Sequence, residues 1–409
     1  MKRIYTSLDI GSDTIKVIVA ELYKGKLNLL AAKTVKSEGI KKGLIVDANL
    51  AAGSIKKALE EVSRMLGIFI DKVIVNVPSY LAEFSVVTSE VNISKDFVEG
   101  IDISSVMDKA YSNYHNANLE ILTILPIDFK VDNKIVLDPK GLPGSILKMR
   151  GVLVTLPSKN IYSVINLIEA IGVKVVDVSL SGISDYYALK KDNMSSKAGL
   201  IINMGSETTT ISLYNKGIIV KNSVVQFGSS DVTSDIAYIY KLSINDARQL
   251  KENFALAHHK FANSSEVYEI INSLSENISI NQVEVSEIVN SRVEQILNFV
   301  KNDVNSLANH EIDYIILTGG ASNLPYMVDV TEGVLGRKCS LGNINTIGVR
   351  SNKYSTCLGS IYYFVQKLKL QGKGYTMVED DDSSDLASPR KNSVNEKNII
   401  KALIGFFDE

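Results

Sequence analysis

Residues 8–16 read Leu-Asp-Ile-Gly-Ser-Asp-Thr-Ile-Lys, and residues 202–209 read Ile-Asn-Met-Gly-Ser-Glu-Thr-Thr. Each stretch ends one apolar run with a short polar turn and enters a second apolar run, which is the pattern of a β-hairpin. The two turns align at one constant spacing: Asp9 with Asn203, Gly11 with Gly205, Ser12 with Ser206, Asp13 with Glu207 and Thr14 with Thr208. This internal repeat predicts two similar α/β halves that face each other across a cleft.

The bulk composition excludes several classes of protein. A chain of 409 residues is too long for one hydrophobic core and predicts at least two domains. Because 44 basic side chains are balanced by 46 acidic ones, we expect no nucleic-acid partner. Cys339 and Cys357 form neither a disulfide framework nor a zinc-type pair, and the four histidines lack the HExxH spacing. A reducing compartment fits, and a metal site built from these side chains is not expected.

The sequence also restricts how the chain can meet a membrane. The apolar stretch behind Lys2 and Arg3 is short and reaches Asp9, so no secretory signal peptide is predicted. The densest apolar run, residues 68–77, is interrupted by charged residues and is far shorter than the roughly 18 residues of a spanning helix. We therefore expect any membrane attachment to be peripheral.

Between the repeated hairpins the pattern changes. After a predicted amphipathic helix over 51–66, the chain shows the pattern of a small inserted α/β unit: a strand over 85–93, a helix over 104–114, and strands over 120–131 and 151–156. Near the end, residues 371–396 are rich in Gly, Ser, Pro, Asn and acidic side chains and predict a disordered linker.

The last residues, 397–409, have an amphipathic pattern. Wound as a helix, six apolar side chains fall within an arc of about 160°: Ile399, Ile400, Leu403, Ile404, Phe406 and Phe407. Lys401 lies on the other side and can attract anionic lipid. Such a helix can also pack on its own domain, but the preceding polar linker favours a helix on the membrane surface. One tail should bind weakly, whereas a polymer that presents many tails binds firmly.

Three glycine turns suggest a phosphate site: Gly11-Ser12, Gly205-Ser206 and Gly319-Gly320-Ala321-Ser322. Each follows an apolar strand, and glycine lets backbone N–H groups approach phosphate oxygens. Asp9 can hold Mg²⁺ through water, and Lys16 can reach a phosphate. For any one of these turns alone, an ordinary tight turn is the alternative interpretation.

These motifs resemble the first phosphate, second phosphate and adenosine motifs of the actin, Hsp70 and sugar-kinase superfamily. Within it, residues 4–364 and the tail are most similar to the bacterial cell-division FtsA family, and residues 228–237 and the insert ending Met149-Arg150-Gly151 are particular to that family. The resemblance implies an α/β, actin-like (RNase H-like) two-lobed ATPase fold with an FtsA-type 1C insert and a C-terminal amphipathic helix. The implied divisions are subdomain 1A over 1–82 and 161–195, 1C over 83–160, 2A over 196–227 and 310–370 with the closing helix, 2B over 228–309, the linker over 371–396 and the membrane-targeting helix over 397–409.

The resemblance also implies ligands and partners. It implies ATP and Mg²⁺ in the cleft, self-association into filaments, and binding of the FtsZ C-terminal tail by subdomain 2B. The implied nucleotide-binding residues are Asp9, Gly11, Ser12, Lys16, Gly205, Ser206, Thr208, Thr209, Lys251, Gly319, Gly320, Ala321 and Ser322. No catalytic residue is assigned.

Three positions depart from the superfamily pattern. Asn203 stands where the second phosphate motif usually has aspartate, Glu207 where the family tends to have glycine, and Arg248 where a ribose-contacting glutamate is expected. An amide supplies neither charge nor a general base, and a carboxylate beside a triphosphate is repulsive. We therefore predict weakened nucleotide binding and ATP turnover that is slow or absent.

The predicted function is an actin-like adaptor that polymerises and tethers FtsZ to the cytoplasmic face of the membrane at the division site. The alternatives are a related actin-fold ATPase of pilus assembly and a small-molecule kinase of the same superfamily. An Hsp70-type chaperone is a further alternative, but the chain has no β-rich substrate domain after the second half.

Overall fold

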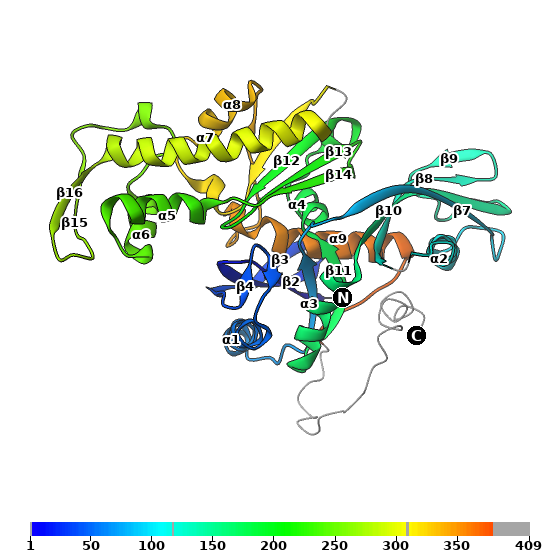
Figure 1. Ribbon diagram of the computed structural model, residues 1–409. Helices are drawn as coiled ribbons and strands as arrows, with labels where there is room; N and C mark the ends of the chain where they lie inside the picture. Colours follow the sequence, from blue (N-terminus) through cyan, green and yellow to red (C-terminus); the bar gives the residue numbers. More distant parts are fainter. Residues whose placement is uncertain (1, 117, 308–310, 379–409) are drawn as a thin grey trace.

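The computed structural model describes residues 2–116, 118–307 and 311–378, and two five-stranded sheets form its centre (Figure 1). The first sheet has the order β11-β6-β1-β2-β3, with strands Lys174–Leu180, Lys72–Val77, Arg3–Ile10, Thr14–Tyr23 and Lys26–Lys36. The second has the order β14-β13-β12-β17-β18, with strands Ile218–Val225, Thr209–Asn215, Ala198–Met204, Tyr314–Thr318 and Ser340–Leu341. In both, an antiparallel three-stranded meander continues into two parallel strands, so the predicted duplication is confirmed.

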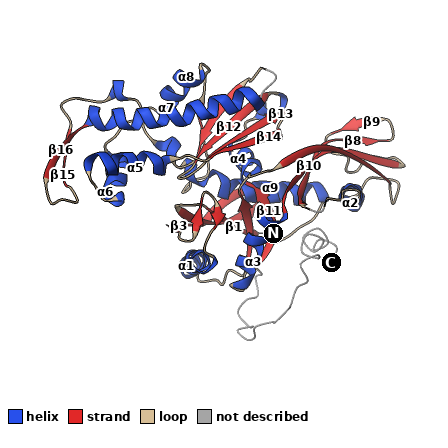
Figure 2. Cartoon of the chain, in the orientation of Figure 1, coloured by secondary structure: helices blue, strands red, loops and turns tan. Residues whose placement is uncertain are grey.

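Two helices are packed between the sheets and join the lobes. Helices α4 (Ser181–Leu189) and α9 (Ser355–Gln371) lie between the first sheet and the inner face of the second (Figure 2). Their contact requires a glycine, because a Cβ on Gly359 would lie 1.7 Å from the Ser184 carbonyl oxygen. On the inner face of the second sheet, the Tyr214 hydroxyl donates to the Gly182 carbonyl oxygen of α4 at 2.6 Å.

Helices α1 (Ala48–Leu66) and α3 (Ser158–Ala170) cover the outer face of the first sheet. Helix α1 begins three residues before the predicted start at residue 51, because Asp47 caps it by accepting hydrogen bonds from the backbone of Asn49 and Leu50. It ends at Gly67, whose φ of 69° is in the left-handed region that favours glycine. We call the first sheet with these helices the first lobe.

The second lobe is the second sheet with the elements on its outer side. These are α5 (Ser229–Tyr240), α6 (Ile244–Asn253), the hairpin β15 (Val267–Ile271) and β16 (Asn277–Asn281), α7 (Gln282–Leu307) and α8 (Met327–Leu335). Their apolar side chains form a core separate from that of the first lobe, which includes Val232 of α5 and Val293 of α7.

The inserted unit has its own sheet and core. Its sheet has the order β7-β10-β8-β9, with strands Glu83–Asn92, Ile146–Pro157, Leu119–Val131 and Lys134–Val136, and helix α2 (Gly100–Ser112) packs against it. Strand β10 begins at Ile146 rather than at the predicted residue 151. Residues 146–150 alternate between buried and exposed side chains, with Lys148 and Arg150 on the solvent face, which extends the strand. Helix α2 begins before residue 104, since Asp102 accepts a hydrogen bond from the Glu99 backbone at 2.8 Å.

Residues 372–378 differ from the predicted linker. They run back along the first strand, where the Met377 backbone donates to the Ile4 carbonyl oxygen at 2.8 Å and the Ile4 backbone donates to Thr376 Oγ1 at 3.0 Å. Burial of the Met377 side chain favours this packing, and Met377 is 2% exposed. The rest of the linker and the amphipathic segment 397–409 lie outside the described residues. Within the described ranges, none of the helices combines the length and apolar character that crossing a bilayer requires.

Candidate functional site: a cleft between the lobes

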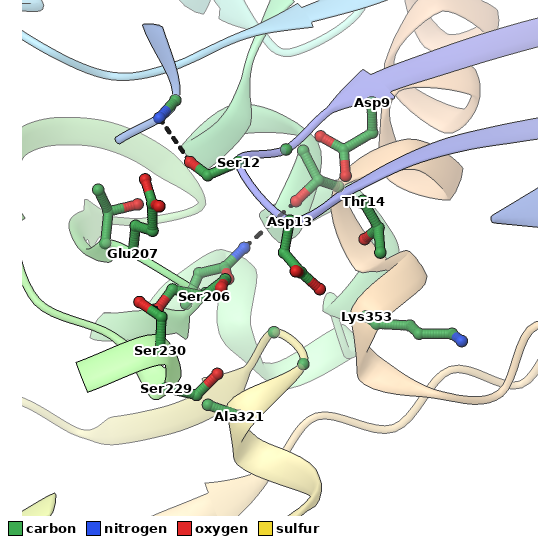
Figure 3. A pocket seen from close by; sticks show the side chains of 18 of the residues that line it. Asp9, Ser12, Asp13, Thr14, Ser206, Glu207, Ser229, Ser230, Ala321 and Lys353 are labelled. Atoms are coloured by element: carbon green, nitrogen blue, oxygen red, sulfur yellow. Dashed lines mark hydrogen bonds between the residues drawn. The ribbon is translucent and has the colours of Figure 1, made fainter. Parts of the chain in front are cut away.

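A cleft of about 560 Å³ lies between the two lobes. Its walls come from both β-hairpin turns, the turn after β17, helices α5 and α6, and the start of α9 (Figure 3). The predicted residues that line it are Asp9, Gly11, Ser12, Lys16, Gly205, Ser206, Thr208, Lys251, Gly319, Gly320 and Ala321. Sites of this size accommodate nucleotide-sized ligands.

The two duplicated turns have the same hydrogen bond. The Gly11 backbone N–H donates to the Thr14 carbonyl oxygen at 3.2 Å, and the Gly205 N–H donates to the Thr208 carbonyl oxygen at 2.9 Å. A Cβ on Gly11 would lie 2.8 Å from the Thr14 oxygen, so glycine allows the turn to close. The predicted correspondence of the two turns is therefore present in three dimensions.

Asp9 and Lys16 are a cross-strand pair at the base of the first turn. They face each other in the antiparallel register of β1 and β2, and Lys16 Nζ donates to Asp9 Oδ2 at 2.9 Å. Burial by itself would lower the pKa of Lys16, but the Asp9 carboxylate outweighs it and the pKa is raised. The cleft therefore contains a fixed positive charge beside the first turn.

The turn after β17 forms the third wall. Gly319 has a φ of 89°, and a Cβ there would lie 2.4 Å from Asn203 Oδ1 and 2.5 Å from the Met204 carbonyl oxygen. Only glycine fits this position, because a side chain would be strained in φ and would collide with β12. Ser322 of the same motif is buried behind the wall, where its hydroxyl donates to the Gly319 carbonyl oxygen at 2.8 Å.

The second turn rests on the beginning of α5. The backbone of Ser229 donates to the Gly205 carbonyl oxygen at 3.0 Å, and that of Ser230 donates to the Ser206 carbonyl oxygen at 2.7 Å. A Cβ on Gly228 would lie 2.4 Å from the Ser206 oxygen, so glycine permits this approach. Thr209 lies on the side of the turn away from the cleft, where its hydroxyl donates to the Phe227 carbonyl oxygen at 2.9 Å. Neither Thr209 nor Ser322 lines the cleft.

Lys251 of α6 reaches the cleft from the second lobe. Its ammonium group donates to the Ser229 carbonyl oxygen at 3.0 Å and to Thr233 Oγ1 at 2.8 Å. Burial, with a further contribution from the nearby Arg248 charge, lowers the pKa of Lys251 to about 8. The Lys251 side chain therefore loses its positive charge as the pH rises through about 8.

An ion pair crosses the cleft at the first turn. Arg248 of α6 donates to Asp13 at 2.9 Å and 2.7 Å through its two terminal nitrogens, and Lys36 of β3 donates to the same carboxylate at 2.5 Å. Although burial would raise the pKa of Asp13, the hydrogen bonds from Arg248 and Lys36 lower it. Arg248 stands where the resemblance implies a ribose-contacting glutamate; in the structure it joins the second lobe to the first turn.

Glu207 makes the equivalent contact from the second turn. Its carboxylate accepts a hydrogen bond of 2.5 Å from the backbone of Lys42, which lies between the short strands β4 (Ile40–Lys41) and β5 (Leu44–Ile45) of the first lobe. The next backbone N–H, of Gly43, donates to Ser12 Oγ at 2.7 Å. The small hairpin thus contacts both turns, and Glu207 is directed to a backbone donor of the opposite lobe.

Asn203 is bonded to a buried carboxylate that the sequence did not single out. Asn203 Nδ2 donates to Asp185 Oδ2 at 2.6 Å and to Thr356 Oγ1 at 3.2 Å. The hydroxyls of Ser355 and Thr356 both donate to Asp185 Oδ1 at 2.8 Å. Asp185 is 1% exposed, and burial raises its pKa to about 6.

Sequence reasoning missed Asp185 because an isolated aspartate in a short helix has no motif. It also missed the cleft-facing Ser229 and Ser230, although residues 228–237 had been recognised as a family-specific segment. The signal for these two was their place at the start of a helix that follows a glycine, where backbone N–H groups can face an anion.

The described lining suits a magnesium nucleotide better than a metal held by protein alone. Among residues 2–116, 118–307 and 311–378, no three His, Cys, Asp or Glu side chains are grouped as metal ligands. The cleft instead offers three lysines, Lys16, Lys251 and Lys353, with several hydroxyls and glycine turns, which are suitable partners for phosphate oxygens. The carboxylates of Asp9, Asp13, Glu207 and Glu252 also line the cleft, and Asp9 could hold a Mg²⁺ ion through water.

Two family models match the chain. The model described as cell division protein FtsA matches residues 200–359, and the model described as the SHS2 domain inserted in FtsA matches residues 82–155. The second match contains β7, α2, β8 and β9 and most of β10, so the inserted unit corresponds to that SHS2 domain.

Known proteins are similar over most of the chain. The cell division protein FtsA of Bacillus subtilis (strain 168) is 29% identical over 385 residues, covering 92% of this chain and 87% of that protein. The FtsA of Streptococcus pneumoniae serotype 2 is 30% identical over 357 residues, covering 86% of this chain and 78% of that protein. The solved structure of MreB 5 of Spiroplasma citri bound to AMPPNP, at 12% identity, has a TM-score of 0.58 and covers 90% of this chain and 98% of that chain, which shows an actin-like fold. This chain therefore belongs to the FtsA family of actin-like cell-division proteins.

Proposed function

We propose that this protein binds ATP with Mg²⁺ in the interlobe cleft, forms filaments, and tethers FtsZ to the cytoplasmic face of the membrane at the division site. The observation that carries the proposal is the convergence of both duplicated turns and the Gly319 turn on one cleft. Membership of the FtsA family supplies the cell-division role.

Several contacts support ATP as the ligand. Lys16 is held beside the first turn by Asp9, and Lys251 lies at the second lobe's wall, so two cations flank the position between the turns. MreB 5 of Spiroplasma citri, which shares the actin-like fold, was crystallised bound to AMPPNP. Bound nucleotide would supply phosphate oxygens to these lysines and to the backbone of the glycine turns.

The same cleft favours weak binding and slow turnover. Glu207 is turned toward the Lys42 backbone, but its negative charge remains at the second turn. Asn203 contributes an uncharged amide where the duplicated Asp9 contributes a carboxylate. An amide cannot accept a proton from an attacking water, so β12 offers no general base.

The membrane and partner roles rest on family membership and on the sequence. The apolar face of residues 397–409 would enter the lipid interface, and filament formation would add the weak affinities of many tails. We assign the FtsZ tail to the subdomain over 228–309, the part of the second lobe that lies outside the duplicated sheet.

Equilibrium binding of ATP with Mg²⁺ tests the cleft. We expect Lys16→Ala to weaken ATP binding at least about tenfold, because a buried cation beside the phosphates is removed. Lys26→Ala is the matched control, since Lys26 is exposed at the far end of β3 and should leave the affinity unchanged. Equal affinity of the Lys16 variant and the unaltered protein would reject the cleft as the ATP site.

Co-sedimentation with liposomes tests the tether. The full chain should carry FtsZ into the pellet with vesicles that contain anionic lipid, and the chain lacking residues 397–409 should still bind FtsZ but leave it in the supernatant. If the truncated chain pellets with vesicles as well as the full chain does, the tail is not the anchor.

A further inference from the structure

We infer that Asp185 is a positioning residue that fixes the Asn203 amide and thereby keeps the β12 wall of the cleft uncharged. This inference deepens the proposed function, and it rests on the cleft being a nucleotide site. It starts from the duplication: Asp9 and Asn203 occupy the same position of the two hairpins, yet only one carries charge.

The hydrogen bonds leave one orientation for the Asn203 side chain. Thr356 has a single hydroxyl proton, which it donates to Asp185, so its oxygen accepts from Asn203. Both protons of the Asn203 amide are therefore used, by Asp185 and Thr356. A flipped amide would place its oxygen against the Asp185 carboxylate, which is repulsive.

The amide oxygen consequently points toward the Gly319 turn. It lies 2.4 Å from the place where a Cβ on Gly319 would stand, and both Asn203 and Gly319 line the cleft. What β12 presents there is a neutral acceptor, whereas β1 presents the Asp9 carboxylate. The carboxylate that Asn203 lacks is thus supplied by Asp185 of α4, which does not line the cleft.

The pairing predicts that the two residues can be exchanged. Asn203→Asp alone would put a second carboxylate 2.6 Å from Asp185 in a buried site, and two such charges cannot both ionise there. Asp185→Asn/Asn203→Asp would restore an amide-to-carboxylate hydrogen bond, because the amide at position 185 can donate while its oxygen still accepts from Ser355. The double exchange would move the charge to the cleft wall.

Unfolding of the four proteins in this cycle, without nucleotide, tests the pairing. Each single substitution should raise the unfolding equilibrium constant at pH 8. For the double exchange, we expect this constant to be at least about tenfold below the value obtained by multiplying the fold-changes of the two single variants. The control cycle combines Asn203→Asp with Asp177→Asn, which removes a partly buried carboxylate paired elsewhere with Lys367, and should be additive. Additive effects in the Asp185 cycle would overturn the inference. If Asn203→Asp fails to fold, recovery of a folded protein in the double exchange gives the same answer, and failure of both would overturn it.

The ratio of ATP dissociation constants without and with Mg²⁺ tests the consequence for the cleft. A carboxylate on β12 would repel ATP alone and favour the magnesium complex, so the double exchange should raise this ratio roughly fivefold or more. An unchanged ratio in a folded double exchange would overturn the claim that Asp185 keeps this wall uncharged. If the unaltered protein binds no ATP, the proposed function fails, while the unfolding cycle still decides the pairing.

Discussion

Asp13 and Arg248 lie on opposite lobes and are joined across the cleft by two hydrogen bonds, of 2.9 Å and 2.7 Å. Two parallel N–H···O bonds to one carboxylate are stronger than a single surface ion pair. We expect Arg248→Ala to lower the free energy of unfolding by about 1 to 2 kcal/mol, measured by urea denaturation. Adding Asp13→Asn should cost little more, and fully additive losses would contradict the pairing.

The contribution of Asp13 should also depend on pH. Because the pKa of Asp13 is lowered from 3.8, its stabilising effect is present above that pH and is lost as the pH falls below it. Lys36→Ala is the comparison variant: Lys36 also contacts Asp13, but its side chain is 62% exposed, so its removal should cost less than that of Arg248.

Glu207→Gln should tighten ATP binding. The amide oxygen can still accept the hydrogen bond from the Lys42 backbone, so the contact between the lobes is kept while the charge is removed. Relief of charge repulsion near the phosphates is worth about 1 kcal/mol or more, and we expect at least about a fivefold gain in affinity by titration calorimetry. Glu60→Gln on α1, far from the cleft lining, should change nothing. A weaker affinity for the Glu207 variant would show that its carboxylate assists binding.

Lys251 should make ATP binding dependent on pH. Its pKa of about 8 means that it is mostly charged at pH 7 and mostly neutral at pH 9. Since an anionic ligand favours the charged form, affinity should fall roughly fivefold or more over this interval, and binding near pH 8 should take up protons. Lys251→Met should abolish this dependence, whereas Lys16→Met should weaken binding and retain it. A Lys251→Met protein with an unchanged pH profile would assign the effect to another group.

Asp185 should produce the opposite pH dependence to Asp13. Its pKa is raised from 3.8 to about 6, so the folded protein binds the proton more tightly than the unfolded chain does. The stabilising contribution of the Asp185 carboxyl is therefore complete below about pH 4. It is lost as the pH rises through about 6, which lowers the free energy of unfolding by roughly 2 to 3 kcal/mol. Asp185→Asn should remove this slope from the unfolding free energy measured between pH 4 and 7. The neighbouring Asp9 carboxylate helps to raise the pKa of Asp185, so Asp9→Asn should reduce the slope without abolishing it.

The sequence predicted the features that depend on local pattern. Alternation and glycine located the two hairpins, and their common spacing implied facing halves, because a duplicated unit needs a partner to cover its apolar face. The same reasoning brought the three glycine turns to one cleft. Local pattern could not reveal which side chains meet across it. The pairs Asp13–Arg248 and Asn203–Asp185 join residues from different elements, and one sequence carries no record of such contacts.

The errors at element boundaries have a similar cause. Residues 372–378 look like a linker because they contain two glycines, a lysine and a threonine, yet Met377 is buried against the first strand. Strand β10 extends to Ile146 because pairing with β7 and β8 continues through residues 146–150, where the charged Lys148 and Arg150 alternate with the buried Leu147 and Met149. In both places tertiary contacts overrode the local preference.

The attachment of residues 376–377 to β1 determines where a mechanical load would enter the molecule. The Thr376 hydroxyl and the Met377 backbone form hydrogen bonds to Ile4 at the start of this strand, and Asp9 lies in the cleft near the other end of the same strand. A pull on the chain beyond residue 378 would thus be exerted on the strand that carries Asp9. Under the proposed function, tension from a membrane-bound tail and nucleotide in the cleft would therefore act on opposite ends of this eight-residue strand.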